Sequence, residues 1–366
     1  MDIYVLDRNF MTVAIVDTFI STIWTDRFWE CGDFEIKVLA SRENLDIFQE
    51  DYYLWREDSD HMMIIEETTL DSDAEAGAQL LIKGRSLESI LDRRVIWGKK
   101  TISGSLQDSI ETLLNENLIN PSDGNRKING FQFRKSTDSR ITGLTVDAQY
   151  TGDDLYTVIS DLCKTANIGF RVLMPTDGTY EFSLYAGIDR SYDQSENPCI
   201  IFSPNFENLM NSNCYSSKKE YKTVSLVGGP EETDPDTDIT TQEFVSAEID
   251  SGGGSGLDRR EMYTSASDVR REVDGEEIPI NEYRAQLVQK GKEALTEHII
   301  TKTFDGEAEL SRSFTYGVDF YMGDIVQNEN EYDQIFTSRI TEYIWSEDES
   351  EVKQYPTFTV IEEGGN

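Results

Sequence analysis

Cysteine is scarce in this chain of 366 residues, and its four copies are irregularly spaced, with no C-x-x-C pair among them. That pattern is neither a disulfide framework nor a zinc signature. We expect buried free thiols at all four positions, which are Cys31, Cys163, Cys199 and Cys214. No secretory signal opens the sequence, and no apolar run approaches the ~20 residues of a membrane span. The sequence therefore predicts a soluble protein made in a cytoplasm, without a membrane-spanning segment.

Positive charge is also in short supply, because 33 Lys and Arg residues stand against 70 Asp and Glu residues, for a formal net charge of −37. A protein that grips nucleic acid through its phosphates needs clustered Lys and Arg, and so does one that binds an anionic membrane. Both classes are therefore disfavoured. One interpretation of the excess is solubility through mutual repulsion. The other is a channel wall past which DNA slides without sticking.

The usual hydrolase and nucleotide-binding motifs are missing. The tract Gly252–Gly256 is not a G-x-S-x-G elbow, because Leu257 stands where the last glycine is required. Only His61 and His298 could act as a triad base, and we interpret both as structural. Neither H-E-x-x-H nor a P-loop occurs. We predict no catalytic residues, no cofactor and no enzyme activity.

One acidic segment is a candidate metal site. Asp234, Asp236 and Asp238 have the spacing that opens an EF-hand loop. The sixth position is Ile239 instead of glycine, and the twelfth is Val245 instead of glutamate. We therefore predict a solvated loop and no metal. Paired carboxylates for glycoside cleavage carry no signal here, because 70 acidic residues always place some pair at a suitable separation.

An aromatic-rich segment near the N-terminus has two interpretations. Its rings could stack on sugars or nucleobases, but their placement on alternating strands favours core or subunit contacts. The rings concerned are Trp24, Phe28, Trp29 and Phe34.

The chain is long enough for two to four domains, and its apolar content of 38% can build packed cores. Short apolar runs between turns predict a β-rich N-terminal region over residues 1–98. Capping patterns and helical spacing follow, which predicts an α+β region over 99–200. Residues 201–300 read as a β segment, a flexible acidic and Gly-rich linker and a helix. Residues 301–366 are again β.

Several elements can be placed more closely. Helices are expected at 86–94, after the capping pattern Ser105–Asp108, after the capping pattern Thr151–Asp154, and at Asn281–His298. A hairpin turn is expected at Pro175–Thr179, and strands at Phe314–Tyr316 and Ser338–Trp345. In the last strand, Ile340 and Ile344 should share one face, and Tyr343 and Trp345 the other.

Separated blocks of the sequence resemble one family in the right order. They are the segment Ile23–Ile36 with the sequence IWTDRFWECGDFEI, Trp55–Asp60, Gly84–Arg94, Gly317–Val326, Arg339–Glu342 and Tyr355–Phe358. The chain is similar to siphovirus tail hub proteins, also called tail-associated or baseplate hub proteins. These lie at the tip of long non-contractile phage tails. The middle of the chain resembles the family in layout more than in motifs.

The resemblance implies a β-rich α+β multidomain fold, with two tube-forming β-barrel-like domains and a peripheral α+β insertion. The tube domains would be 1–98 and 301–366 with part of 200–250, and 99–200 would be peripheral. The resemblance also implies a homotrimeric ring that closes the distal tail tube and lets DNA pass. Expected partners are the tail tube or distal tail protein, the tape-measure protein, and other baseplate or receptor-binding proteins.

Three alternatives stay open. The chain could be a carbohydrate-binding tail component, a cell-wall hydrolase, or the equivalent hub of a tail-derived bacteriocin. Within the hub interpretation, we expect a minimal hub located in the virion and assembled in the host cytoplasm. Any wall-degrading activity would belong to another protein. We also expect acidic residues to face the bore of the ring.

Overall fold

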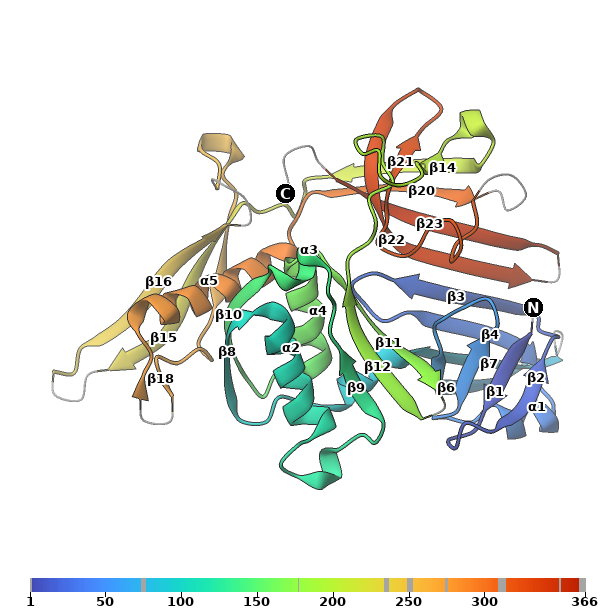
Figure 1. The fold of residues 1–366 in the computed structure, drawn as a ribbon, viewed down its shortest axis with the longest axis horizontal. Coiled ribbons are helices and arrows are strands. Elements are labelled where there is room, and N and C mark those ends of the chain that lie inside the picture. The colour runs from blue at the N-terminus through green and yellow to red at the C-terminus, as the bar shows by residue number, and fades with distance from the viewer. Residues whose placement is uncertain are drawn as a thin grey trace.

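The computed structural model describes residues 2–73, 77–176, 178–233, 237–248, 253–273, 276–308, 314–348 and 350–361. The fold is β-rich, with large antiparallel sheets and a few short helices (Figure 1). No helix in these ranges is both long and apolar enough to cross a membrane.

The N-terminal strands form a curved sheet around a core that contains Trp24, Phe34 and Ile36. The chain opens with a hairpin, since Ile3–Leu6 pairs with Thr12–Val16 around the turn after Leu6. The elements are β1 (Ile3–Leu6), β2 (Thr12–Val16), β3 (Ser21–Arg27), β4 (Asp33–Leu39), α1 (Arg42–Ile47), β5 (Tyr53–Arg56), β6 (Met63–Asp73), β7 (Gly77–Ser86) and the 3-10 helix η1 (Leu87–Arg93).

The middle module follows, with its own core of aliphatic and aromatic side chains. The hairpin β11–β12 is confirmed, and Ser105 caps α2 by accepting a hydrogen bond from the Asp108 N–H at 3.3 Å. The elements are β8 (Lys99–Ser105), α2 (Leu106–Leu114), the π-helical turn η2 (Asn115–Ile119), η3 (Gly124–Arg126), β9 (Phe131–Arg134), α3 (Ser139–Thr142), β10 (Thr145–Thr151), α4 (Leu155–Thr165), β11 (Gly169–Thr176) and β12 (Thr179–Tyr185).

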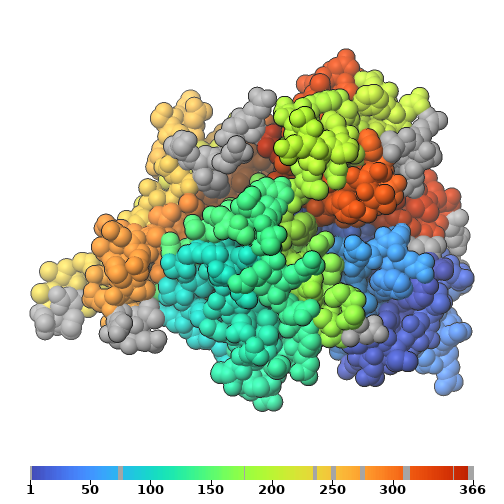
Figure 2. Space-filling model, in the orientation of Figure 1, coloured from blue at the N-terminus to red at the C-terminus, as the bar shows by residue number. Residues whose placement is uncertain are grey.

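A third unit, which we call the arm, comprises β15–β19 and α5 and projects to the left in Figures 1 and 2. The expected helix is confirmed as α5, which buries Tyr283, Leu287 and Leu295 against the sheet β16-β15-β17. The elements are β15 (Val224–Thr233), β16 (Thr240–Glu248), η5 (Gly256–Asp258), β17 (Glu261–Ser265), β18 (Glu272–Val273), β19 (Glu276–Glu277) and α5 (Ile280–Thr296). Asp234, Asp236 and Gly252 lie outside the described residues.

The C-terminal strands surround a phenylalanine-rich core that also receives residues from the segment before the arm. The elements are β13 (Ile201–Phe202), η4 (Pro204–Phe206), β14 (Leu209–Ser217), β20 (Thr301–Ala308), β21 (Ile325–Glu329), β22 (Ile335–Asp348) and β23 (Val352–Val360).

One sheet runs through both ends of the chain. Its main order is β14-β20-β23-β22-β3-β4-β7-β6-β5-β1-β2, so the first and last parts of the sequence share hydrogen bonds at β3 and β22 (Figure 1). Within the described residues the sheet is open, because β14 and β2 each pair with one strand. These hydrogen bonds therefore do not divide the sheet into two closed barrels.

Three local expectations were wrong. A β-bulge between Ile340 and Glu342 shifts the alternation of β22, so Ile340 shares the buried face with Tyr343 and Trp345. The helix expected after Thr151–Asp154 is confirmed as α4, which is capped by Asp154, whose carboxylate accepts from the Thr157 N–H at 2.8 Å.

The other two concern the strand expected at Phe314–Tyr316 and the burial of two of the four thiols. Residues 314–316 form only an isolated bridge, between Tyr316 and Phe320. All four thiols are free, but Cys199 is only partly buried and Cys214 on edge strand β14 is exposed.

Candidate functional site

The segment Trp24–Phe34, which carries the strongest family resemblance, lies where the modules meet. Strand β3 pairs with β22 over seven residues, from Arg27 opposite Glu342 to Ser21 opposite Asp348. The partners are more than 300 positions apart in sequence, so this pairing fixes the two ends of the chain against each other. A junction of this kind positions large parts of the molecule and needs no catalytic group.

Adjacent rows of the sheet differ sharply in character. One row is buried and aromatic, and runs Trp345, Trp24, Phe34, Gly84 and Ile65. The next row points to the opposite face, and runs Lys353, Ser346, Ile23, Glu35, Lys83 and Glu67. Side chains alternate between faces along a strand, so one face covers the cores and the other is open and polar.

The junction between β3 and β22, which we call the seam, includes a buried arginine that packs against the two tryptophans. The Arg56 guanidinium lies 4.2 Å from the ring centroid of Trp345 and 5.2 Å from that of Trp24, and the residue is 3% exposed. A buried cation is costly unless it is paired. Asp58 provides the pair, since it accepts two hydrogen bonds from Arg56, at 2.9 and 2.7 Å. The aromatic faces add cation–π attraction.

Next along the seam, a carboxylate meets two stacked tyrosines. Asp26 lies opposite Tyr343, and the Tyr316 hydroxyl donates to its Oδ2 at 3.2 Å. The two tyrosine rings stack with centroids 4.0 Å apart. Burial, and then the charge of Asp26, raise the pKa of Tyr316 well above its ordinary value. The hydroxyl therefore stays protonated as a donor.

Phe28 crosses from the N-terminal strands into the C-terminal core, where it is fully buried. Glycines make room for its ring. A Cβ atom on Gly323 would lie 2.3 Å from the ring, and one on Gly169 would lie 2.6 Å from it. The middle module and the C-terminal strands therefore both close around this side chain.

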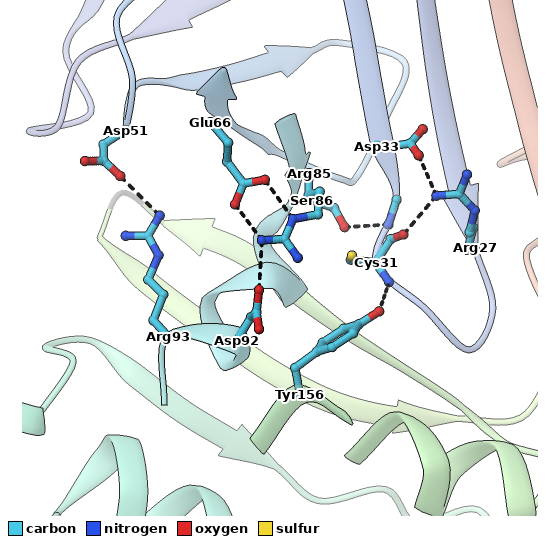
Figure 3. A network of polar contacts seen from close by, with 11 residues as sticks. Arg27, Cys31, Asp33, Asp51, Glu66, Arg85, Ser86, Asp92, Arg93 and Tyr156 are labelled. Carbon is cyan, nitrogen blue, oxygen red and sulfur yellow. Dashed lines mark hydrogen bonds and ion pairs between the residues drawn. The ribbon is translucent and has the colours of Figure 1, made fainter. Parts of the chain in front are cut away.

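The turn between β3 and β4 also forms hydrogen bonds that connect it to the middle module (Figure 3). The Tyr156 hydroxyl accepts from the Cys31 N–H at 2.9 Å, and the Ser86 hydroxyl accepts from the Gly32 N–H at 2.8 Å. Arg27 donates to Asp33 and to Glu342, at 2.8 Å each. The turn between β3 and β4 thus contacts three parts of the molecule.

A second buried ion pair holds the end of the middle module to the C-terminal strands. Arg190 Nε lies 2.8 Å from Asp324 Oδ2, and Asp324 is 1% exposed. Asp324 also accepts from the backbone N–H groups of Ile188 at 2.6 Å and Tyr321 at 3.1 Å. One carboxylate therefore joins two segments, residues 188–190 and 321–324.

The arm contacts the middle module mainly through polar groups. The Tyr150 hydroxyl donates to Glu293 at 2.7 Å, and Lys164 Nζ lies 2.6 Å from a Glu297 oxygen. Burial, and then repulsion from Glu297, raise the pKa of Asp161 to about 6. At neutral pH the Asp161 carboxylate is therefore ionised, and its burial near Glu297 lowers the stability of the folded protein.

Asp161→Asn is expected to raise the free energy of unfolding at pH 8 by about 1 kcal/mol, a value that allows for solvent screening of this partly exposed side chain. Because the folded pKa is raised, the stability contributed by Asp161 is present below pH ~4 and is lost as the pH rises through about 6. Thermal unfolding at pH 8 and pH 4 measures the difference, with the exposed Glu30→Gln as control. A gain of equal size at both pH values would contradict this reasoning.

The aromatic candidates lie together in the structure: the ring centroids of Trp24 and Phe34 are 6.0 Å apart, and those of Phe28 and Trp29 are 5.2 Å apart. Trp24, Phe28 and Phe34 are core residues, and Trp29 is half-buried, so the core interpretation is confirmed for the first three. His61 Nδ1 lies 3.9 Å from the buried Glu88, and His298 contacts a backbone carbonyl at Glu220. Within the described ranges, no group of three acidic, His or Cys side chains could hold a metal. The absence of catalytic residues stays a prediction.

This open two-core sheet, with its inserted module and arm, is the fold of phage tail proteins. The 43 kDa tail protein of prophage MuSo2 from Shewanella oneidensis superposes with a TM-score of 0.58 at 10% identity, covering 98% of each chain. A tail protein from Neisseria meningitidis gives 0.58 at 11%, covering 99% of this chain and 96% of its own. Prophage tail protein gp18 from Listeria monocytogenes gives 0.53 at 14%, covering 100% and 96%.

The sequence identifies the family within that class. Residues 2–358 match the Siphovirus ReqiPepy6 Gp37-like protein family, and the chain belongs to it. No curated protein matches the chain significantly. The expected siphovirus tail family is confirmed, and the protein is a phage tail component located in the virion.

Proposed function

We propose that this protein is the hub of the siphovirus tail tip, a structural and non-catalytic homotrimer that closes the distal tube and lets DNA pass. The observation that carries the proposal is the single sheet shared by the N-terminal and C-terminal strands, with one face covered and one open. Each copy has an N-terminal and a C-terminal group of strands. Three copies therefore place six groups around an axis, which matches a tube of sixfold symmetry. The tube-forming regions would be 1–98 and 301–366, with 99–200 at the periphery.

The ends of the sheet supply surfaces for assembly. Edge strand β2 exposes Val13 and Ile15, and edge strand β14 exposes Met210 and Tyr215. Exposed apolar groups on a strand that has one unpaired edge favour contact with another chain. Because the two edges lie at opposite ends of the sheet, a head-to-tail contact between copies can close into a ring.

The open face would line the bore. Several of its charges are paired, since Lys83 lies 2.9 Å from Glu35, and Arg27 contacts both Asp33 and Glu342. We therefore expect this face of the sheet to be close to neutral, instead of acidic. Duplex DNA carries a phosphate about every 1.7 Å of axis, so a wall of paired cations offers it no series of anchoring sites.

Light scattering at several protein concentrations, in low and high salt, tests the trimer. We expect a mass three times 41.7 kDa, favoured by salt, because 3 × −37 gives −111 formal charges and salt screens their repulsion. Ile15→Lys, on the exposed edge, should remain monomeric with unchanged thermal stability. A monomer under every condition, or a trimer that tolerates the lysine, would contradict this assembly.

One observation favours a second function, glycan binding by the arm. Leu226, Phe244 and Tyr263 are about half exposed on the sheet face away from α5, and the aromatic rings meet over Gly228. Flat exposed rings of this kind can stack on sugars. The double substitution Phe244→Ala with Tyr263→Ala should reduce saturable binding to host cell walls at least about fivefold, which is ~1 kcal/mol. Wall binding that is absent, or unchanged in the variant, would exclude this function.

A further inference from the structure

A hollow of about 470 Å³ lies where the N-terminal strands pass into the middle module. It is bordered by η1 and η3 and is lined by Asp92, Arg93, Arg94, Val95, Trp97, Asp123, Asn125 and Arg126. Small-ligand sites fall in this range of volume. The hollow is separate from the seam between β3 and β22 and from the aromatic face of the arm.

Three arginines border this hollow in a chain of strongly negative net charge. Of the two acids beside them, Asp92 lies 3.0 Å from Arg85 (Figure 3), and Asp123 stays in the lining of the hollow, where its carboxylate accepts from the Asn125 N–H at 3.0 Å. Arg93 is paired with Asp51 at 3.2 Å (Figure 3). Within the described part of the chain, no carboxylate is within ion-pair distance of the remaining two, Arg94 and Arg126.

Both of these guanidinium groups are held in place by neutral oxygens. Arg94 donates to the carbonyls of Arg126 at 3.0 Å and Arg93 at 2.8 Å. Arg126 Nη2 donates to the Val95 carbonyl at 2.6 Å and to Asn117 Oδ1 at 2.9 Å. These contacts fix the positions of the two guanidinium groups but do not neutralise their charge. Burial, and then the charges of Arg126 and Arg93, lower the pKa of Arg94, as expected for a cation without a counter-ion.

A tryptophan stands beside the cations. Trp97 is 61% exposed, and the Arg126 guanidinium carbon lies 4.4 Å from its ring centroid. The arginine covers one face of the indole and steadies it through a cation–π contact. A flat ligand ring can stack on the uncovered part.

From this arrangement we propose that the hollow binds a phosphorylated ring compound, with the phosphate held by Arg94 and Arg126 and the ring lying against Trp97. Fixed guanidinium forks match phosphate oxygens in geometry and charge. A sugar phosphate and a nucleoside monophosphate share this chemistry. An acidic protein segment is less well matched, because the cations lie in a small hollow beside a single ring instead of along an extended surface.

Calorimetric titration of the whole chain with glucose 1-phosphate, adenosine monophosphate, inorganic phosphate, glucose and an acidic peptide tests the site. We expect both phosphorylated ring compounds to bind, inorganic phosphate to bind more weakly, and glucose not to bind. Arg126→Gln should weaken the binding of every phosphate at least about tenfold, as loss of a charged hydrogen bond implies. Trp97→Ala should weaken only the ring compounds. The relative affinities of the two compounds distinguish a sugar phosphate site from a nucleotide site.

Arg134→Gln is the matched control, because Arg134 is an exposed arginine paired with Glu181 outside the hollow. It should leave all affinities unchanged. Thermal unfolding establishes that each variant is folded, and Arg94→Gln gives an independent test if Arg126→Gln is not. The proposal is overturned if phosphates fail to bind, if Arg126→Gln and Arg94→Gln bind them normally, or if an acidic peptide binds in their place.

Discussion

Phe28→Ala is expected to lower the free energy of unfolding by about 3–5 kcal/mol, the cost of removing a fully buried aromatic ring. The ring belongs to the N-terminal segment but fills the core of the C-terminal strands, between Gly169 and Gly323. Its loss would leave a cavity where three parts of the chain converge. Urea unfolding of the wild type and the variant measures the change.

Phe206→Ala is the matched control, because Phe206 is 56% exposed in the same part of the molecule. Its effect should stay within about 0.5 kcal/mol, as for most surface substitutions. A loss below about 1 kcal/mol for Phe28→Ala would contradict the burial of this ring in the C-terminal core.

Asp324→Ala is expected to cost about 3–5 kcal/mol, because it leaves the Arg190 guanidinium buried without its counter-ion. The substitution also removes the acceptor for the N–H groups of Ile188 and Tyr321. Urea unfolding again gives the change in free energy.

Arg190→Met separates the two contributions of this cluster. It removes the cation but leaves Asp324 with its two backbone donors, so it should cost clearly less than Asp324→Ala. If the two variants were equally unstable, the charge left on Arg190 would not be the dominant cost.

Local patterns in the sequence were sufficient for much of the secondary structure. The capping pattern at Ser105, the alternation across the β11–β12 hairpin and the helical spacing along α5 each depend on residues close together in sequence. Such patterns predict secondary structure reliably because helix capping and amphipathic burial depend on only a few neighbouring residues.

Long-range pairing could not be predicted in the same way. The antiparallel match of β3 with β22 joins segments more than 300 residues apart, and no local pattern indicates which strand is the partner. The bulge at Ile340 also escapes a strict two-residue alternation. Arg56 was missed because the rings that make its burial tolerable come from both ends of the chain.

The functional surfaces were predicted less well than the family. The aromatic segment was correctly interpreted as core for Trp24 and Phe28, but the exposed rings at Phe244 and Tyr263 were not singled out. A signal for the cationic hollow was present in the sequence as Arg93-Arg94-Val-Ile-Trp97-Gly-Lys-Lys, a basic run with one tryptophan in an acidic chain. Its meaning depends on Arg126, which only the fold brings beside Trp97.

Electron cryomicroscopy of intact phage tails tests the hub proposal most directly. The account predicts three copies of this chain in a ring at the distal end of the tube, with the row containing Ile23, Glu35 and Lys83 facing the channel. A different copy number, a position on the outside of the tube, or that row buried away from the channel would contradict it.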